Sequence, residues 1–177
     1  YDTAAIDAID NFVRSGGSVL FISDANFGGD WADASNSDQQ FLDRFGLVMN
    51  QDQGTYAKTR SDGEFLEPNH PIFAAVDEFH GEGVTPISIG TLPADVTATV
   101  LAGAEGQVRR NASPFGGNNQ GPSTSAAAND GALVVATAGL GKVVGHFDRN
   151  TFFNQGGVGS DITRFNNEQY AINLFHW

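Results

Sequence analysis

Two aspartates directly follow apolar segments that the sequence predicts to be buried strands. Asp24 follows residues 18–23, and Asp148 follows residues 142–147. A continuous apolar run that ends at an aspartate is typical of a central strand in a parallel sheet. Because ligands of open α/β sheets bind at the carboxyl ends of the strands, the two carboxylates could bind a ligand, share a metal ion or act as an acid and a base. The alternative is that each aspartate only caps the turn that follows it.

A polar, glycine-rich segment after Asp24 adds further candidate side chains. Trp31 together with Asn26 offers a flat apolar face beside planar hydrogen-bonding groups, which is the mixture that sugar-binding sites use. The alternative is that Trp31 covers the core. The residues predicted to bind a ligand at this edge are Asp24, Asn26, Trp31, Asp148, Asn150 and Asn154.

Carboxylates of the same segment could bind a Ca²⁺ ion, because oxygen-rich loops suit this ion. The candidate ligands are Asp24, Asp30 and Asp33, and their spacing does not match the EF-hand pattern. A solvated acidic loop is therefore the alternative. No other cofactor is expected, since the four histidines lack zinc-site spacing and no phosphate-binding glycine loop occurs. His146 is expected to be a hydrogen-bonded structural residue.

Several reaction classes are excluded by composition. The chain has no cysteine, so disulfides, thiolate metal sites and cysteine nucleophiles are ruled out. The G-x-S-x-G motif of serine nucleophiles is also absent from the sequence. The sequence therefore identifies no catalytic residue.

The charge balance excludes further partners. The 177 residues include 21 acidic and 9 basic residues, which gives a net charge of -12. Such a chain repels phosphate backbones, so no nucleic-acid partner is expected. No apolar run approaches the roughly 20 residues of a membrane helix, so no direct membrane insertion is expected. Charged residues make up only 17% of the chain, and only two of them are lysines. Such a composition is common in bacterial secreted or envelope proteins. The alternative is an acidic cytosolic protein.

The apolar spacing predicts the elements that position the candidate residues. Helices are expected at residues 3–15, at residues 37–45 and at residues 166–175. Strands are expected at residues 18–23, 47–49, around 56, 86–89, 97–101, 133–137 and 142–147, the last two joined by a tight turn at residues 139–141. Residues 111–130 contain almost no large apolar side chain and are predicted to be a mobile loop, with a binding loop as the alternative. The pattern predicts a three-layer α/β fold. Its sheet is expected to be partly parallel, with an antiparallel extension.

Three segments in the correct order resemble class I glutamine amidotransferase-like domains. Residues 12–22 resemble the unit of helix, Gly-Gly and strand found in that family. Residues 69–72 resemble its HPI turn. Residues 139–148 resemble its glycine-containing strand, which ends at an aspartate. The last helix, from Asn167 to Trp177, resembles the end of these domains. The similarity is to non-catalytic members, namely trehalose-utilisation-type domains and the accessory domain of gliding-motility transporters.

The resemblance implies a flavodoxin-like α/β fold with a mostly parallel sheet and a structural role for His70. Catalytic members of the family use a cysteine nucleophile, which this chain lacks, so the resemblance implies no amidotransferase activity. The family's first β-α units precede the helix that opens this chain. Residues 1–177 are therefore expected to be one domain of a longer protein and to contact the rest of it.

These observations predict a non-catalytic binding or scaffolding domain of a larger secreted or envelope protein. Its ligand would be a glycan or another protein. One alternative is a hydrolase that acts on glycans with Asp24 and Asp148 as a carboxylate pair. Another is a structural subunit of an assembly.

Overall fold

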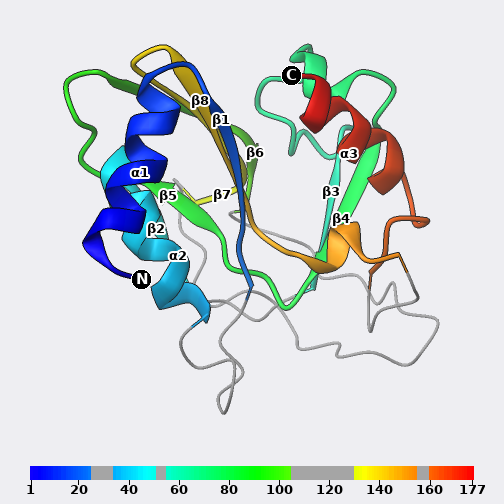
Figure 1. Cartoon of the computed structure of the whole chain (residues 1–177). Helices are drawn as coiled ribbons and strands as arrows, with labels where there is room; N and C mark the ends of the chain where they lie inside the picture. Colours follow the sequence, from blue (N-terminus) through cyan, green and yellow to red (C-terminus); the bar gives the residue numbers. More distant parts are fainter. Residues whose placement is uncertain (25–33, 51–54, 105–129, 155–159) are drawn as a thin grey trace.

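The computed structural model describes residues 1–24, 34–50, 55–104, 130–154 and 160–177 (Figure 1). Its helices are α1 (Thr3–Arg14), α2 (Ala34–Leu42) and α3 (Asn167–His176), with short 3-10 helices η2 (Asp43–Phe45), η3 (Pro71–Phe73) and η4 (Asn150–Phe152). Its strands are β1 (Ser18–Ile22), β2 (Leu47–Met49), β3 (Thr55–Thr59), β4 (Glu78–Glu82), β5 (Ile87–Ile89), β6 (Val96–Gly103), β7 (Asp130–Ala138) and β8 (Gly141–His146).

Six strands form a mixed sheet in the order β1-β8-β7-β5-β2, and β6 also pairs with β7. Among the described strand pairs, only β1 and β8 run parallel. The predicted α/β class is confirmed, but the prediction of a mostly parallel sheet is wrong for these strands. The physical reason is the short turn between β7 and β8, because a connection of two residues can join only antiparallel neighbours.

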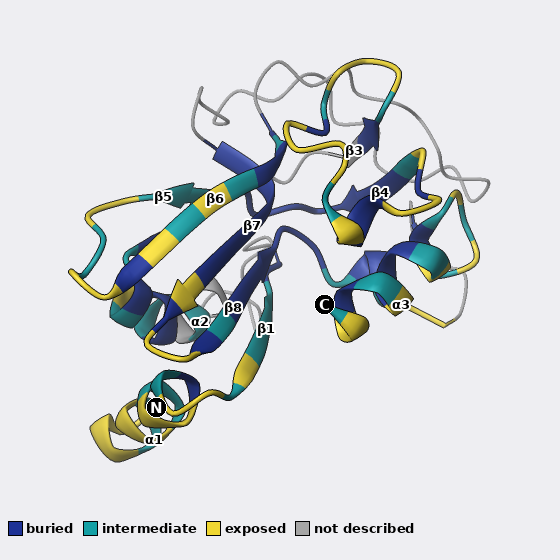
Figure 2. Cartoon of the chain, turned by 90° about the horizontal axis from the view of Figure 1, so that it is seen from above, coloured by how far each residue is buried: buried dark blue, intermediate teal, exposed yellow. Residues whose placement is uncertain are grey.

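Helices cover the two faces of this sheet. Val13 of α1 and Leu42 of α2 belong to one core, on the face that also holds Val143 of β8. Tyr170 and Leu174 of α3 belong to a second core, on the face that holds Val144. Figure 1 and Figure 2 show α1 and α2 on one side of the strands and α3 on the other. Alternate residues of β8 thus point to opposite cores, as the pleat of a strand requires.

The helix and strand boundaries follow local sequence signals. The side chain of Asp2 accepts a hydrogen bond from the N–H of Ala5 at 2.8 Å and so caps α1, as its position predicts. His70 caps η3 by accepting a hydrogen bond from the N–H of Ile72 at 3.3 Å, in agreement with a structural role. Residues 111–129 of the predicted mobile loop lie outside the described residues, and Asp130 already belongs to β7. No helix of the described ranges is long and apolar enough to span a membrane.

β4 pairs with β3 in a separate two-stranded sheet, and β4 was not predicted from the sequence. β4 nevertheless lies close to the end of β8. A Cβ atom on Gly81 would lie 2.7 Å from the ring of Phe147 and 2.9 Å from Cβ of Asp148. A glycine at this position therefore permits the close approach that brings β4 to the strand ends.

Candidate functional site

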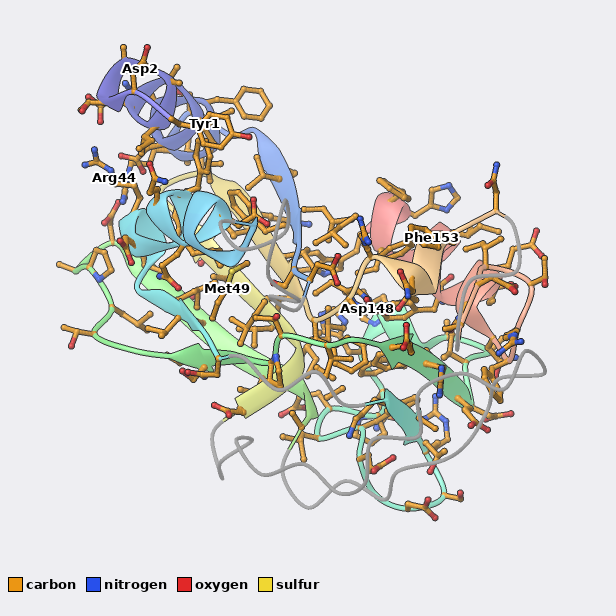
Figure 3. All side chains as sticks on the ribbon, turned by 90° about the horizontal axis from the view of Figure 1, so that it is seen from below. Tyr1, Asp2, Arg44, Met49, Asp148 and Phe153 are labelled. Carbon is orange, nitrogen blue, oxygen red and sulfur yellow. The ribbon has the colours of Figure 1, made fainter. Side chains whose placement is uncertain are left out.

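Asp24 and Asp148 lie at the carboxyl ends of the two parallel strands, as predicted. Ile22 pairs with His146 in the register of β1 and β8, and the two aspartates each follow two residues later. The N–H of Ser23 donates to the carbonyl oxygen of His146 at 2.8 Å and extends the pairing by one residue. Figure 3 shows Asp148 in the middle of the molecule, between the part that holds α1 and the part that holds α3.

A third carboxylate, Glu82 at the end of β4, joins these two. The N–H of Glu82 donates to Oδ2 of Asp148 at 2.7 Å, and Nδ2 of Asn150 donates to Oε2 of Glu82 at 2.8 Å. Nε of Arg149 lies 2.5 Å from Oδ2 of Asp24. We call Asp24, Glu82, Asp148, Arg149 and Asn150 the carboxyl-edge cluster.

Burial controls the protonation of this cluster. Asp148 is fully buried at 0% exposure, and this burial raises the pKa of its carboxyl well above the usual value. The N–H groups of Glu82 and Asn150 oppose the increase in pKa, whereas the carboxylates of Asp24 and Glu82 add to it. Burial also raises the pKa of Glu82, which the hydrogen bond from Asn150 partly offsets. The cluster thus favours a neutral Asp148 next to an Asp24 that is paired with Arg149.

A buried polar network fixes the segment that follows Asp148. The ring of His146 contacts the hydroxyl of Tyr170 through Nδ1 at 2.9 Å and the hydroxyl of Thr151 through Nε2 at 3.0 Å. Thr151 in turn donates to the carbonyl oxygen of His80 at 2.8 Å. Burial lowers the pKa of His146 to about 3, so the ring is neutral and can donate at one nitrogen and accept at the other. His146 is therefore the hydrogen-bonded structural residue that the sequence predicts.

The same network reaches the segment before α3. The N–H of His80 donates to Oδ1 of Asn167 at 3.0 Å, and Nδ2 of Asn167 donates to Oγ of Ser160 at 3.1 Å. Ser160 also donates to the carbonyl oxygen of His80 at 3.1 Å. β4, η4 and α3 are thus held together behind the carboxyl-edge cluster, which gives Asn150 a fixed support.

Three buried polar atoms at the strand ends have no hydrogen-bond partner among the described residues. They are Oγ of Ser23, Oδ1 of Asp148 and Oδ1 of Asn150. The amide oxygen of Asn150 only accepts hydrogen bonds, whereas the hydroxyl of Ser23 and the neutral carboxyl of Asp148 can donate or accept. Buried polar atoms normally have partners, so this position suits a group that both donates and accepts hydrogen bonds.

The structure brings together only part of the predicted site. Asp24, Asp148 and Asn150 lie in the carboxyl-edge cluster, while Asn154 is exposed beyond η4. Asn26 and Trp31 lie outside the described residues, as do the predicted metal ligands Asp30 and Asp33. Over the described ranges, no group of three or more histidine, aspartate or glutamate side chains could hold a metal ion. The Ca²⁺ site stays a prediction, because it needs residues that are not described.

Two members of the cluster, Glu82 and Arg149, were not predicted. Glu82 ends a strand with the sequence Glu-Phe-His-Gly-Glu, which lacks an apolar alternation that would mark it as buried. Its contacts to Asp148 and Asn150 span 66 and 68 residues of sequence. The signal available for Arg149 was its position beside Asp148, where a cation can pair with the facing carboxylate.

Comparisons with known proteins give a fold relationship. No family model matches the sequence, and no curated protein matches it. The structure is similar to that of the cytoplasmic protein STM3548 from Salmonella typhimurium, with a TM-score of 0.55 and 16% sequence identity over 99% of this chain. The chain spans 61% of the length of that protein. At this identity the similarity concerns the fold alone.

Proposed function

We propose that this chain is a non-catalytic binding domain with a class I amidotransferase-like, three-layer flavodoxin-like fold. Its ligand is a glycan that binds at the carboxyl-edge cluster. The observation that carries the proposal is the grouping of Asp24, Glu82 and Asn150, whose carboxylate and amide oxygen atoms lie together at the strand ends and whose side chains are not fully buried. Sugar hydroxyls donate hydrogen bonds and carry no charge, so they match acceptors in a chain with a net charge of -12.

The bonding of the carboxylates supports binding over catalysis. Asp24 is paired with Arg149, and Asp148 accepts a hydrogen bond from the backbone of Glu82. A glycosidase needs two carboxyl groups that reach both sides of the scissile bond, and Asp148 is completely buried. The low lysine content and the 17% of charged residues support a larger secreted or envelope protein as the context of this domain.

A glycan array with matched variants tests the proposal. Asn150→Ala removes an amide oxygen of the cluster, and Trp31→Ala removes the aromatic face predicted from the sequence. We expect each variant to lose about tenfold or more in affinity for the glycans that the wild type binds. Glu168→Gln, at an exposed position of α3, is the control and should bind as the wild type does. No glycan binding by the wild type, or equal binding by all four proteins, would sink the proposal.

One observation favours the hydrolase as a second candidate. Burial raises the pKa of Asp148, and a carboxyl group with a raised pKa near an ion-paired carboxylate is typical of acid–base pairs. Release of reducing ends from a glycan by the wild type, abolished in Asp148→Asn, would establish this activity and contradict a non-catalytic role. We expect no release above the blank.

A further inference from the structure

Asp62 and Gly63 form an exposed Asp-Gly pair in the turn that follows β3, outside the carboxyl-edge cluster. The N–H of Asp62 donates to Oγ1 of Thr59 at 3.2 Å. The N–H of Gly63 donates to the carbonyl oxygen of Arg60 at 3.1 Å. These hydrogen bonds join residues that are three apart in an exposed turn, and bonds of this kind open at a small cost in free energy.

The backbone conformation of Gly63 explains why a glycine follows Asp62. Its φ is +75°, in the left-handed region that favours glycine. A Cβ atom at this position would have no neighbouring atom within 4 Å, so the conformation rather than a lack of space calls for glycine. The result is that the backbone nitrogen next to Asp62 has no side chain beside it. The carboxyl carbon Cγ of Asp62 can therefore approach this nitrogen without steric hindrance.

A second Asp-Gly pair, Asp130 and Gly131, lies in the opposite environment. The carboxylate of Asp130 is buried, and its Oδ1 accepts a hydrogen bond from Nδ2 of Asn50 at 2.9 Å. Gly131 is buried in β7, where it pairs with Ile87 of β5 and with Gly103 of β6. The sequence contains no other Asp-Gly pair and no Asn-Gly pair. The same dipeptide thus occurs once in an exposed turn and once inside the sheet.

We propose that the exposed Asp62-Gly63 turn is a modification site at which Asp62 converts to isoaspartate through a succinimide. The backbone nitrogen of Gly63 attacks Cγ of the protonated carboxyl, and the new C–N bond closes a five-membered ring. The hydroxyl of that carboxyl leaves as water with the N–H proton. Water then adds to the main-chain carbonyl carbon of Asp62, and the bond from this carbon to the nitrogen of Gly63 breaks. The chain now continues through Cγ, its mass is unchanged, and no oxidant or reductant is needed.

The modification changes both the turn and the group that it presents. Glu64 ends the turn, accepts the N–H of Thr59 at 2.6 Å and lies 3.6 Å from Nζ of the buried Lys58. Isoaspartate adds a carbon atom to the main chain between Thr59 and Glu64, so it displaces this carboxylate. The α-carboxylate freed at residue 62 is the group that isoaspartate methyltransferases recognise. Its oxygen takes the methyl group of S-adenosylmethionine, and S-adenosylhomocysteine leaves.

Such a methyltransferase with labelled S-adenosylmethionine is the probe for the test. The whole folded chain is incubated for weeks at neutral pH and then digested with trypsin. Cleavage after arginine and lysine separates the two pairs, since residues 61–109 hold the first and residues 111–142 hold the second. We expect at least about tenfold more methyl label in the first peptide, because the sheet holds Asp130 and Gly131 in place. Asp62→Glu keeps the carboxylate but would have to close a six-membered ring, so it should remove this label.

Two further measurements use the wild type alone and do not depend on the folding of a variant. Fragmentation of the first peptide by electron transfer should place the isoaspartate at residue 62. Incubation in urea should label both peptides, because the unfolded chain protects neither pair. Equal labelling of both peptides from the folded chain overturns the proposal, as does label that Asp62→Glu leaves in place. A first peptide that gains label in urea but none in the folded chain also overturns it, since the turn would then protect Asp62.

Discussion

Asp148 is the residue at which burial and hydrogen bonding act most strongly against each other. Its carboxyl is completely buried and close to two other carboxylates, yet the N–H of Glu82 donates to it. Burial dominates, so the pKa of Asp148 in the folded protein lies well above its usual value of 3.8. The residue holds the end of β8 to the end of β4, and this structural contact accompanies any role in binding.

The raised pKa of Asp148 predicts a dependence of stability on pH. Above the unfolded-state pKa, the unfolded chain loses this proton first, so the free energy of unfolding falls as the pH rises toward the folded-state pKa. Asp148→Asn keeps an acceptor oxygen for the N–H of Glu82 and removes the titration. We expect urea denaturation to show a smaller loss of stability between about pH 4 and about pH 8 for this variant than for the wild type.

Asp62→Asn is the matched control for this prediction, because Asp62 is exposed. Its stability should follow the pH dependence of the wild type. The account of Asp148 is contradicted by an Asp148→Asn variant whose stability changes with pH as steeply as that of the wild type.

Gly81 gives a second prediction at the level of one residue. In Gly81→Ala, the new methyl group meets Phe147 and Asp148 at less than 3 Å, so β4 must move away from the end of β8. We expect a loss of about 1–3 kcal/mol in the free energy of unfolding, as for other overpacked positions. Urea denaturation measures it, with Gly103→Ala as control, since the nearest atom to a Cβ there lies at 3.8 Å. Equal stabilities of the two variants would rule out the close approach as the cause.

At the scale of elements, His146 and Tyr170 join β8 to α3. Tyr170 is fully buried, and its ring stacks on Phe79 of β4 with a centroid distance of 4.3 Å. The hydroxyl of Tyr170 meets Nδ1 of His146 at 2.9 Å. α3 therefore packs against two different sheets through one side chain, which fixes the elements behind the carboxyl-edge cluster.

Removal of one oxygen atom tests this junction. Tyr170→Phe keeps the ring packing and leaves Nδ1 of His146 buried without its partner, so we expect the free energy of unfolding to fall by about 1–2 kcal/mol. Tyr1→Phe changes an exposed ring and should have no measurable effect. Thermal denaturation of the three proteins provides the comparison. Wild-type stability of Tyr170→Phe would mean that the hydrogen bond contributes little to the junction.

Most elements could be predicted from the sequence because their signals are local. The apolar spacing of α1, the caps and the continuous apolar runs of β1 and β8 all lie within a few residues. β4 could not be predicted, since its polar residues are buried by distant partners such as Asn167. The family resemblance implied a mostly parallel sheet, and this prediction of strand direction was wrong. The short turn at Gly139 indicates antiparallel strands instead.

At the scale of the whole molecule, the parallel pair β1 and β8 organises the proposed ligand site. The carboxyl ends of the two strands carry Asp24 and Asp148 of the carboxyl-edge cluster. The sequence predicted Asp24, Asp148 and Asn150 because each follows a recognisable strand. It did not predict Glu82, because long-range contacts arise only when the chain has folded.

The central claim is that a glycan binds at the carboxyl-edge cluster. Its most direct test is an NMR titration of the ¹⁵N-labelled protein with the strongest ligand from the array. We expect saturable shift changes at the side-chain amide of Asn150 and at the backbone amides of Glu82 and Arg149, with none at the exposed Glu168 of α3. A protein that binds no glycan, or shift changes confined to residues outside the cluster, would contradict the claim.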